Sequence, residues 1–472
     1  MIQMKFMKTL SVLLAALLVL GLAGCSNVDK IEDITQVVTP ADLETFGTYP
    51  NLTTLDATGS TCYSALVKFA EDHPQVDVTY TVSLGAREVS NKDTSVTLLP
   101  DEAQFDALKK NLGYLPQLRS VTLPRTTLTW EELEALKAAH PALEIRYTVD
   151  ILGAEYMPDV TTLDLSAMTE EQAEDVLKPL SLLPELSTLE LTGSTATPLQ
   201  VKAIMEAFPE PEIRYSFQLF GQTLTTDQEE VIFKGVSIGN QGENDIRQAL
   251  DILPNCRRFV LDDCGLKNEV LAAIREDYPD TNVVWRVHFG KYSVLTDTDT
   301  IKAVYNVFDN TVADLKYCRD VKYIDMGHNE TLTDISFMGY MPKLEIIIVS
   351  GSAVADISCF SNCPNLEFLE MAYCWRLEDL SALKECTRLR FLNVSFTSVT
   401  DLSPLDSLNL ERFVCIQSQV PYTERELFTT FHPDCWIRFL GSDPYSLGWR
   451  YDDVGITFSP FYLKMREIFG YE

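Results

Sequence analysis

The sequence predicts an α/β repeat solenoid, with a curved parallel sheet on the concave side and helices and short turns on the convex side. Two observations lead to this fold class. A ten-residue phrase, typified by HPALEIRYTV at 140–149, occurs five times along the chain. Towards the C-terminus, leucine-rich segments follow one another every 21 to 23 residues. Internal repeats of these lengths are typical of stacked units that share one continuous core.

Residues 1–25 have the features of a leader that is removed before folding. Lys5 and Lys8 precede an apolar run over 10–22, which ends in Leu-Ala-Gly-Cys25. A charged start, a short apolar run and small residues before the cut are typical of a secretory signal. The ending resembles the lipobox of bacterial lipoproteins, which implies that Cys25 carries a lipid and becomes the mature N-terminus. The alternative is an ordinary signal peptide with a chance cysteine.

The chain is strongly acidic. Its 472 residues include 38 Lys and Arg against 69 Asp and Glu, a net charge of −31. Without the two leader lysines the net charge becomes −33. Such a field repels phosphate backbones and anionic lipid surfaces, so we expect no nucleic-acid partner. Residues 26–45 are expected to form a polar tether between the anchor and the fold.

The eleven cysteines show no metal-binding spacing. Cys359 and Cys363 lie four residues apart, but no second pair or nearby histidine follows them, so we expect no zinc site and no cofactor. Cys318, Cys363 and Cys386 share one repeat position, and we interpret them as small buried apolar residues. Whether any cysteines pair is left open.

Residues 46–310 are expected to form long repeats of about 68 residues. In one copy, Thr129 begins a helix with a capping-box pattern and Pro141 ends it. The recurring phrase then alternates β-branched and aromatic residues, as a strand does. The β-branched residues are Val78, Ile145, Ile213, Val283 and Ile437, and the aromatic residues are Tyr80, Tyr147, Tyr215, Trp285 and Phe439. A glycine follows each phrase, which predicts a hairpin.

Residues 311–440 are expected to form an array of shorter units of 22 or 23 residues and a closing repeat. Their strands follow an LxxLxL pattern and open at Val321, Leu344, Leu366, Leu389 and Leu410. The array resembles the leucine-rich repeats (LRRs) of the internalin family of bacterial surface proteins. The resemblance implies a leucine-rich-repeat solenoid and adhesion to another protein. One departure is the absence of the usual Asn after each strand.

An aspartate follows each of four short strands. These residues are Asp334, Asp356, Asp379 and Asp401. Each can cap the helical turn that comes next, which is the preferred interpretation, and a ladder of cation ligands is the alternative.

Residues 441–472 do not fit the repeat. They are rich in aromatic residues and end in an amphipathic pattern. Because a solenoid needs its open end covered, we expect this segment to form the C-terminal cap.

The sequence does not predict an enzyme. His73, His140 and His432 each stand where a helix of the recurring phrase ends, and a partly charged imidazole suits that end of the helix dipole. No HExxH, GxSxG or Walker motif is present. An envelope hydrolase whose pocket is lined by Trp449, Arg450 and Tyr462 is an alternative, but no nucleophile–base motif supports it.

The short array carries the stronger signal, which is for binding. The third and fifth positions of an LxxLxL strand point out from the concave sheet. The expected ligand-binding residues are therefore Tyr323, Asp325, Ile346, Phe368, Glu370, Phe391, Asn393 and Arg412. An exposed apolar patch rimmed by acids typically marks an interaction site. Two alternatives stay open: the rings stack only to stabilise the ladder, or the C-terminal tail folds over them.

These observations together predict a lipid-anchored, extracytoplasmic LRR protein of the cell membrane. We expect it to bind a protein or peptide through its concave face, and a basic segment would suit its charge. A structural scaffold of a cell-envelope complex is the alternative interpretation. The sequence leaves the identity and the origin of the partner open.

Overall fold

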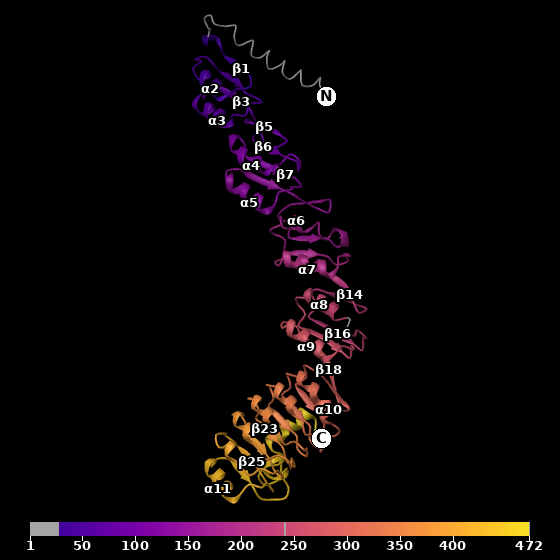
Figure 1. Cartoon of the computed structure of the whole chain (residues 1–472). Coiled ribbons are helices and arrows are strands. Elements are labelled where there is room, and N and C mark those ends of the chain that lie inside the picture. The colour runs from indigo at the N-terminus through magenta and orange to yellow at the C-terminus, as the bar shows by residue number, and fades with distance from the viewer. Residues whose placement is uncertain (1–27, 240–241, 472) are drawn as a thin grey trace, which may run out of the picture. The chain divides into compact units, whose positions relative to one another are not determined.

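A computed structural model describes residues 28–239 and 242–471 (Figure 1). The predicted lipidation site, Cys25, lies outside these residues. The chain divides into two compact units, Met1–Tyr215 and Ser216–Glu472. Among the described residues, no helix is both long enough and apolar enough to cross a bilayer.

The first unit contains three copies of a three-stranded parallel sheet. The sheets are β1 (Asp33–Thr35), β2 (Thr54–Asp56) and β3 (Asp77–Thr79); β6 (Ser95–Thr97), β7 (Ser120–Leu123) and β8 (Glu144–Tyr147); and β11 (Thr162–Asp164), β12 (Thr188–Glu190) and β13 (Glu212–Arg214). The third strand of each sheet is the recurring phrase, so the predicted strand is confirmed. Its β-branched residue pairs in register with the core leucine or valine of the middle strand, as Val78 does with Leu55.

Helices connect these strands and lie on one side of them in Figure 1. They are α2 (Pro40–Phe46), α3 (Tyr63–Asp72), α4 (Phe105–Asn111), α5 (Trp130–Ala139), α6 (Leu177–Leu180) and α7 (Pro198–Ala207), with 3₁₀ turns η1 (Val28–Lys30), η2 (Leu112–Tyr114) and η3 (Glu170–Gln172). Thr129 and Thr197 form capping boxes at the starts of α5 and α7. His140 follows the last residue of α5, and its backbone N–H donates to the carbonyl of Leu136. The helix therefore ends at this histidine, as the sequence predicts.

The aromatic residue of the recurring phrase ties one part of a unit to the next. The Tyr80 hydroxyl donates to the carbonyl of Tyr114 at 2.8 Å, and the Tyr147 hydroxyl donates to the carbonyl of Leu182 at 3.0 Å. Both rings are at least 95% buried. Each copy of the phrase therefore supplies a strand, and the Tyr80 and Tyr147 copies also supply a core ring and a hydrogen bond to a later turn.

A hairpin follows the phrase in four copies, as the glycines predict. The hairpins are β4 (Thr81–Ser83) with β5 (Glu88–Ser90), β9 (Val149–Ile151) with β10 (Ala154–Tyr156), β14 (Ser216–Leu219) with β15 (Gln222–Thr225), and the end of β18 (Asn282–Phe289) with β19 (Tyr292–Leu295). The expectation of one uninterrupted parallel sheet is wrong for the long repeats. Because the chain leaves each third strand as a hairpin, that strand does not pair with the first strand of the next sheet.

The second unit begins with a long repeat and continues as the short array. The long repeat contains β16 (Glu230–Lys234), β17 (Arg258–Asp262), α8 (Glu243–Asp251) and α9 (Asn268–Asp277). The array is one seven-stranded parallel sheet: β20 (Thr300–Lys302), β21 (Tyr323–Asp325), β22 (Ile346–Ile348), β23 (Phe368–Glu370), β24 (Phe391–Asn393), β25 (Arg412–Val414) and β26 (Trp436–Arg438). Here the predicted continuous sheet is confirmed, because short turns leave no room for a hairpin between strands.

Short helical turns stack on one face of this sheet. They are α10 (Asp309–Val312), η5 (Ala313–Tyr317), η6 (Ser336–Tyr340), η7 (Ser358–Asn362), η8 (Ser381–Glu385) and η9 (Ser403–Leu405), followed by the longer α11 (Tyr422–Phe431). We call the opposite face of β20–β26 the concave face. Between the sheet and the turns, Ile324, Ile347 and Leu369 are fully buried, so stacking joins the units into one core.

The four aspartates cap the turns. Each accepts a hydrogen bond at 2.7 or 2.8 Å from the backbone N–H two residues later, at the first residue of the 3₁₀ turn. The acceptor and donor residues are Asp334 and Ser336, Asp356 and Ser358, Asp379 and Ser381, and Asp401 and Ser403. Their capping role is confirmed. The three cysteines at the shared repeat position, Cys318, Cys363 and Cys386, are fully buried, as interpreted from the sequence.

Candidate functional site

The strand register brings the predicted concave-face residues into two columns. Tyr323, Ile346, Phe368, Phe391 and Arg412 stand side by side on successive strands, as do Asp325, Ile348, Glu370, Asn393 and Val414. The alignment that the LxxLxL spacing predicts is therefore present. The residues align because each repeat has nearly the same length, so each new strand pairs with the previous one in the same register.

The predicted exposure of these columns is wrong. Ile346, Phe368 and Phe391 are 1%, 2% and 8% exposed, and Asp325, Glu370 and Asn393 are also buried. Tyr323 and Arg412 are half-buried. The C-terminal segment, residues 441–471, covers them, which is the third of the interpretations that the sequence left open (Figure 1). The expected cap at the end of the stack thus lies across the face of the sheet.

Aromatic packing holds the segment on this face. It comprises the turn η10 (Ser446–Arg450) and the helix α12 (Pro460–Phe469). The Phe368 ring lies 4.8 Å from the rings of both Trp449 and Phe461, and Phe391 stacks on Phe461 at 4.2 Å. Met465 and Phe469 complete the cluster. The amphipathic pattern of the segment exists because one side of α12 faces these rings.

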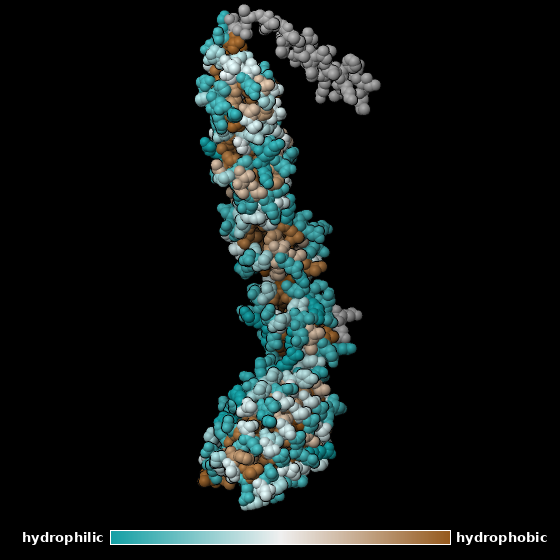
Figure 2. Space-filling model, turned by 60° about the vertical axis from the view of Figure 1, so that its left-hand side comes forward, coloured by the Kyte–Doolittle hydropathy of each residue, from teal (hydrophilic) through white to brown (hydrophobic). Residues whose placement is uncertain are grey.

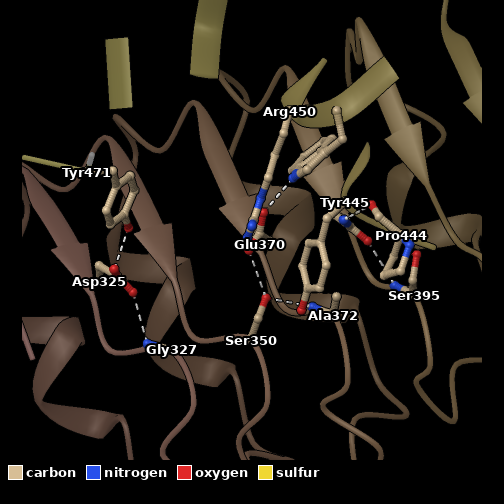
Figure 3. A network of polar contacts seen from close by, with 12 residues as sticks. Asp325, Gly327, Ser350, Glu370, Ala372, Ser395, Pro444, Tyr445, Arg450 and Tyr471 are labelled. Carbon is tan, nitrogen blue, oxygen red and sulfur yellow. Dashed lines mark hydrogen bonds and ion pairs between the residues drawn. The ribbon is translucent and has the colours of Figure 1, made fainter. Parts of the chain in front are cut away.

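The polar residues of the columns bind the same segment (Figure 3). Trp449 Nε1 donates to one carboxylate oxygen of Glu370, and Ser350 donates to the other at 3.1 Å. The Tyr471 hydroxyl donates to Asp325. Asn393 Nδ2 donates to the carbonyl of Pro444 at 3.0 Å. Because buried polar groups need partners, these bonds fix where the segment lies on the sheet.

A cavity of about 310 Å³ remains between the segment and the sheet. Asp325 and Glu370 line it from the strands, and Tyr445, Arg450 and Tyr471 line it from the segment. Burial raises the pKa of the Tyr445 and Tyr471 hydroxyls, and the neighbouring carboxylates act in the same direction, so both rings stay neutral donors. The cavity therefore combines carboxylates, phenols and one guanidinium.

Of the two carboxylates in the cavity, Glu370 has an ion-pair partner and Asp325 has none among the described residues. Arg450 stacks on the Tyr445 ring at 4.3 Å and lies 3.5 Å from Glu370. Among the described residues, Asp325 forms hydrogen bonds with Tyr471 and the N–H of Gly327 but no ion pair. A buried carboxylate without a cation partner is costly, so the site has an electrostatic preference for a cation at Asp325.

A second hollow, of about 520 Å³, adjoins the cavity at the ends of β21–β23. His328 and Tyr445 line both. The other lining residues are Glu330, Gly351, Ser352, Tyr373 and Trp375. Sequence reasoning missed these residues because they lie just after the strands, where side-chain direction depends on the turn conformation and does not follow the LxxLxL period.

The three residues of the enzyme alternative differ in their positions. Arg450 and Tyr462 line the cavity, whereas Trp449 is 4% exposed and bonded to Glu370. In the part of the chain that the structure describes, no group of three His, Cys, Asp or Glu residues is arranged to hold a metal ion. The arrangement offers hydrogen bonding, ion pairing and ring stacking, which are the interactions of a binding site.

Comparisons with known proteins found solved structures that are similar at low sequence identity. No protein-family model matches the chain, and no curated protein does. Among solved structures, an internalin (InlF) of Listeria monocytogenes matches at 15% identity, with 88% of this chain and 83% of that chain covered and a TM-score of 0.26. An LRR protein of Leptospira interrogans matches at 15% identity, with 88% and 97% covered and a TM-score of 0.27.

The fold assignment stands on the strands, registers and stacked turns described above. This chain has the α/β leucine-rich-repeat fold, with long hairpin-bearing repeats followed by short ones.

Proposed function

We propose that this chain is a lipid-anchored, extracytoplasmic recognition module that binds a protein or peptide at the concave face of its short array. The lipobox-like ending at Cys25 supports the anchor. The binding site is the cavity between the sheet and the C-terminal segment, because binding and ion pairing are what its side chains offer.

The observation that carries the proposal is Asp325. Asp325 is 3% exposed, lines the cavity and has no ion pair among the described residues. A Lys or Arg side chain of a partner would supply the missing cation, and the neighbouring tyrosine rings favour a cation through their π faces. The net charge of −31 steers a basic segment to the same protein.

Replacing the charge at Asp325 tests this site. The full chain, purified in detergent, is titrated with glycine-serine peptides that carry a central Arg, Lys or uncharged citrulline. We expect the Arg and Lys peptides to bind and the citrulline peptide to fail. Asp325→Asn, which keeps the shape and one of the two accepting oxygens, should weaken Arg-peptide binding roughly tenfold.

The control removes one carboxylate elsewhere. Glu385 lies on η8, on the other face of the sheet, and Glu385→Gln removes one negative charge, as Asp325→Asn does. Equal binding by wild type, Asp325→Asn and Glu385→Gln would exclude Asp325 as the cation site. Equal weakening by both variants would show that net charge alone attracts the peptides.

The anchor has a separate test. In a bacterial host, Cys25→Ala is expected to move the protein from the membrane fraction to the soluble fraction and to abolish labelling by a radioactive fatty acid. Retention in the membrane with unchanged labelling would contradict the lipoprotein assignment.

A further inference from the structure

The third residue after each of the first six strands of the short array, β20 to β25, has a left-handed backbone. These residues are Tyr305, His328, Gly351, Tyr373, Phe396 and Gln417, with φ between 53° and 70°. This region favours Gly and Asn, and a bulky residue there is strained. Four of the six positions nevertheless carry a ring. The turn imposes the backbone conformation, but it does not require aromatic side chains.

Hydrogen bonds between repeats space these positions regularly. The N–H of His328 donates to the carbonyl of Ser350 at 2.7 Å, and the N–H of Gly351 donates to that of Ala372 at 2.8 Å. Neighbouring positions therefore follow the strand spacing of roughly 4.8 Å. The rings form a row along the ends of the strands, one per repeat.

The row is interrupted at Gly351. Tyr305 stacks on His328 with ring centroids 5.2 Å apart, and Tyr373 stacks on Phe396 at 4.4 Å. Gly351 stands between the two pairs and has no side chain. His328 and Tyr373 are two repeats apart, roughly 9 to 10 Å. One inserted ring in contact with both needs about 7 to 8 Å, twice a carbon–carbon contact.

The interruption coincides with the second hollow, the Gly351 gap, of about 520 Å³. Tyr373 and Trp375 at its wall are 40% and 59% exposed. Glu330 adds an exposed carboxylate. Tyr445 of the C-terminal segment approaches Tyr373, with ring centroids 6.0 Å apart. Among the described residues, His328 makes a ring contact only with Tyr305, so its other face borders the open space.

We propose that the Gly351 gap binds one aromatic side chain of a peptide ligand, inserted between His328 and Tyr373, with a neighbouring basic residue facing Glu330. This inference rests on the proposed peptide-binding function and extends its site, since the cavity and the gap share His328 and Tyr445. The flat walls select a ring, and the carboxylate and the acidic chain select a cation beside it.

A substitution at Gly351 can be used to fill the gap. At Gly351 a built Cβ comes no closer than 3.6 Å to any atom, with His328 as its neighbour. Tyr373 and Phe396 carry rings at φ 64° and 57°, so Gly351→Phe, at φ 70°, copies a conformation that the row already uses. Gly351→Asn is the matched control, because Asn tolerates this backbone and leaves the gap open.

The experiment compares wild type and both variants by calorimetric titration, with the full chain in detergent. The probes are glycine-serine peptides carrying Trp-Arg, cyclohexylalanine-Arg or Ala-Arg, and a cellulose hexasaccharide. We expect Trp-Arg to bind at least about tenfold more tightly than either other peptide to wild type and Gly351→Asn. Gly351→Phe should lose that preference while its melting temperature is unchanged or higher.

Each other outcome decides against the gap. Equal affinity for Trp-Arg and Ala-Arg peptides, or no effect of Gly351→Phe on a folded protein, overturns the gap as a ring site. If Asp325→Asn alone then removed the preference for Arg-containing peptides, the proposed function would still be supported. Tight hexasaccharide binding that Gly351→Phe abolishes would replace the peptide ring by a sugar ring and overturn the proposed occupant.

Discussion

At the scale of single residues, burial decides which charged groups this fold can hold. Glu370 is 1% exposed, yet it accepts from Trp449 and Ser350 and lies beside Arg450. Its position on the fifth place of an LxxLxL strand would otherwise direct it to solvent. The segment from the far end of the chain therefore turns a surface residue into a core residue.

His432 shows the same effect on a titrating group. The sequence suggests a partly charged imidazole at the end of α11, but His432 is 7% exposed and packs on Phe428 at 4.3 Å. Burial lowers its pKa below the usual 6.5. The prediction that His432 is partly charged and stabilised by the helix dipole is therefore wrong, because burial favours the neutral imidazole.

The pH dependence of stability tests this burial. Because the folded-state pKa is below the unfolded-state value, the unfolded chain binds more protons between the two. The stabilisation is complete above about pH 6.5 and is lost as the pH falls through that window towards the folded-state pKa. His432→Gln should remove this part of the slope in urea unfolding from pH ~8 to ~5. An unchanged slope would show that His432 does not contribute.

At the scale of elements, the short repeats depend on turns that are too short to be stable alone. Each 3₁₀ turn of three to five residues leaves backbone N–H groups without helical partners. The aspartate before it accepts one of them. The recurrence of Asp at this place is explained by the turn, because every copy faces the same unsatisfied donor.

Removing one cap should have a measurable effect. Asp356→Ala is expected to lower the free energy of unfolding by about 1 kcal/mol, because the Ser358 N–H loses its acceptor. Asp356→Asn keeps an acceptor oxygen and should restore most of the loss. Chemical denaturation of the three proteins measures the difference. Equal losses in Ala and Asn would assign the effect to charge rather than to capping.

At the scale of the whole molecule, the segment 441–471 joins elements that lie far apart in sequence. It spans the concave face from β25, which η10 contacts, to β20, where Lys302 donates to the carbonyl of Phe469 at 2.8 Å. On the surface shown in Figure 2, hydrophilic side chains predominate and apolar ones form scattered patches. The apolar residues of the concave face, Ile346, Phe368 and Phe391, are covered by the segment 441–471.

Truncation after Leu440 tests this coverage. The shortened chain should expose Ile346, Phe368 and Phe391, bind an apolar dye such as anilinonaphthalene sulfonate and melt at a lower temperature than the full chain. Dye fluorescence and a melting curve measure both effects. A shortened chain that melts like the full one and binds no dye would show that the segment contributes little to the fold.

The sequence by itself determined the repeat architecture. The recurring phrase, the LxxLxL spacing, the glycines and the capping aspartates each predict a local element, because helices, strands and caps depend on residues within a few positions of one another. The two columns of the concave face also follow, since a constant repeat length fixes their register. Asp325 and Glu370 were predicted as site residues on this basis.

Only the tertiary structure decided what covers those columns. The contacts between Glu370 and Trp449 and between Asp325 and Tyr471 join residues 79 and 146 positions apart. No periodic pattern specifies such pairs, because they depend on where an irregular segment returns to the sheet. The Gly351 gap combines the two, because its ring positions recur with the repeat and Tyr445 comes from the segment. The repeat pattern thus determines the sheet, and long-range packing of a non-repeating segment determines which residues line the site.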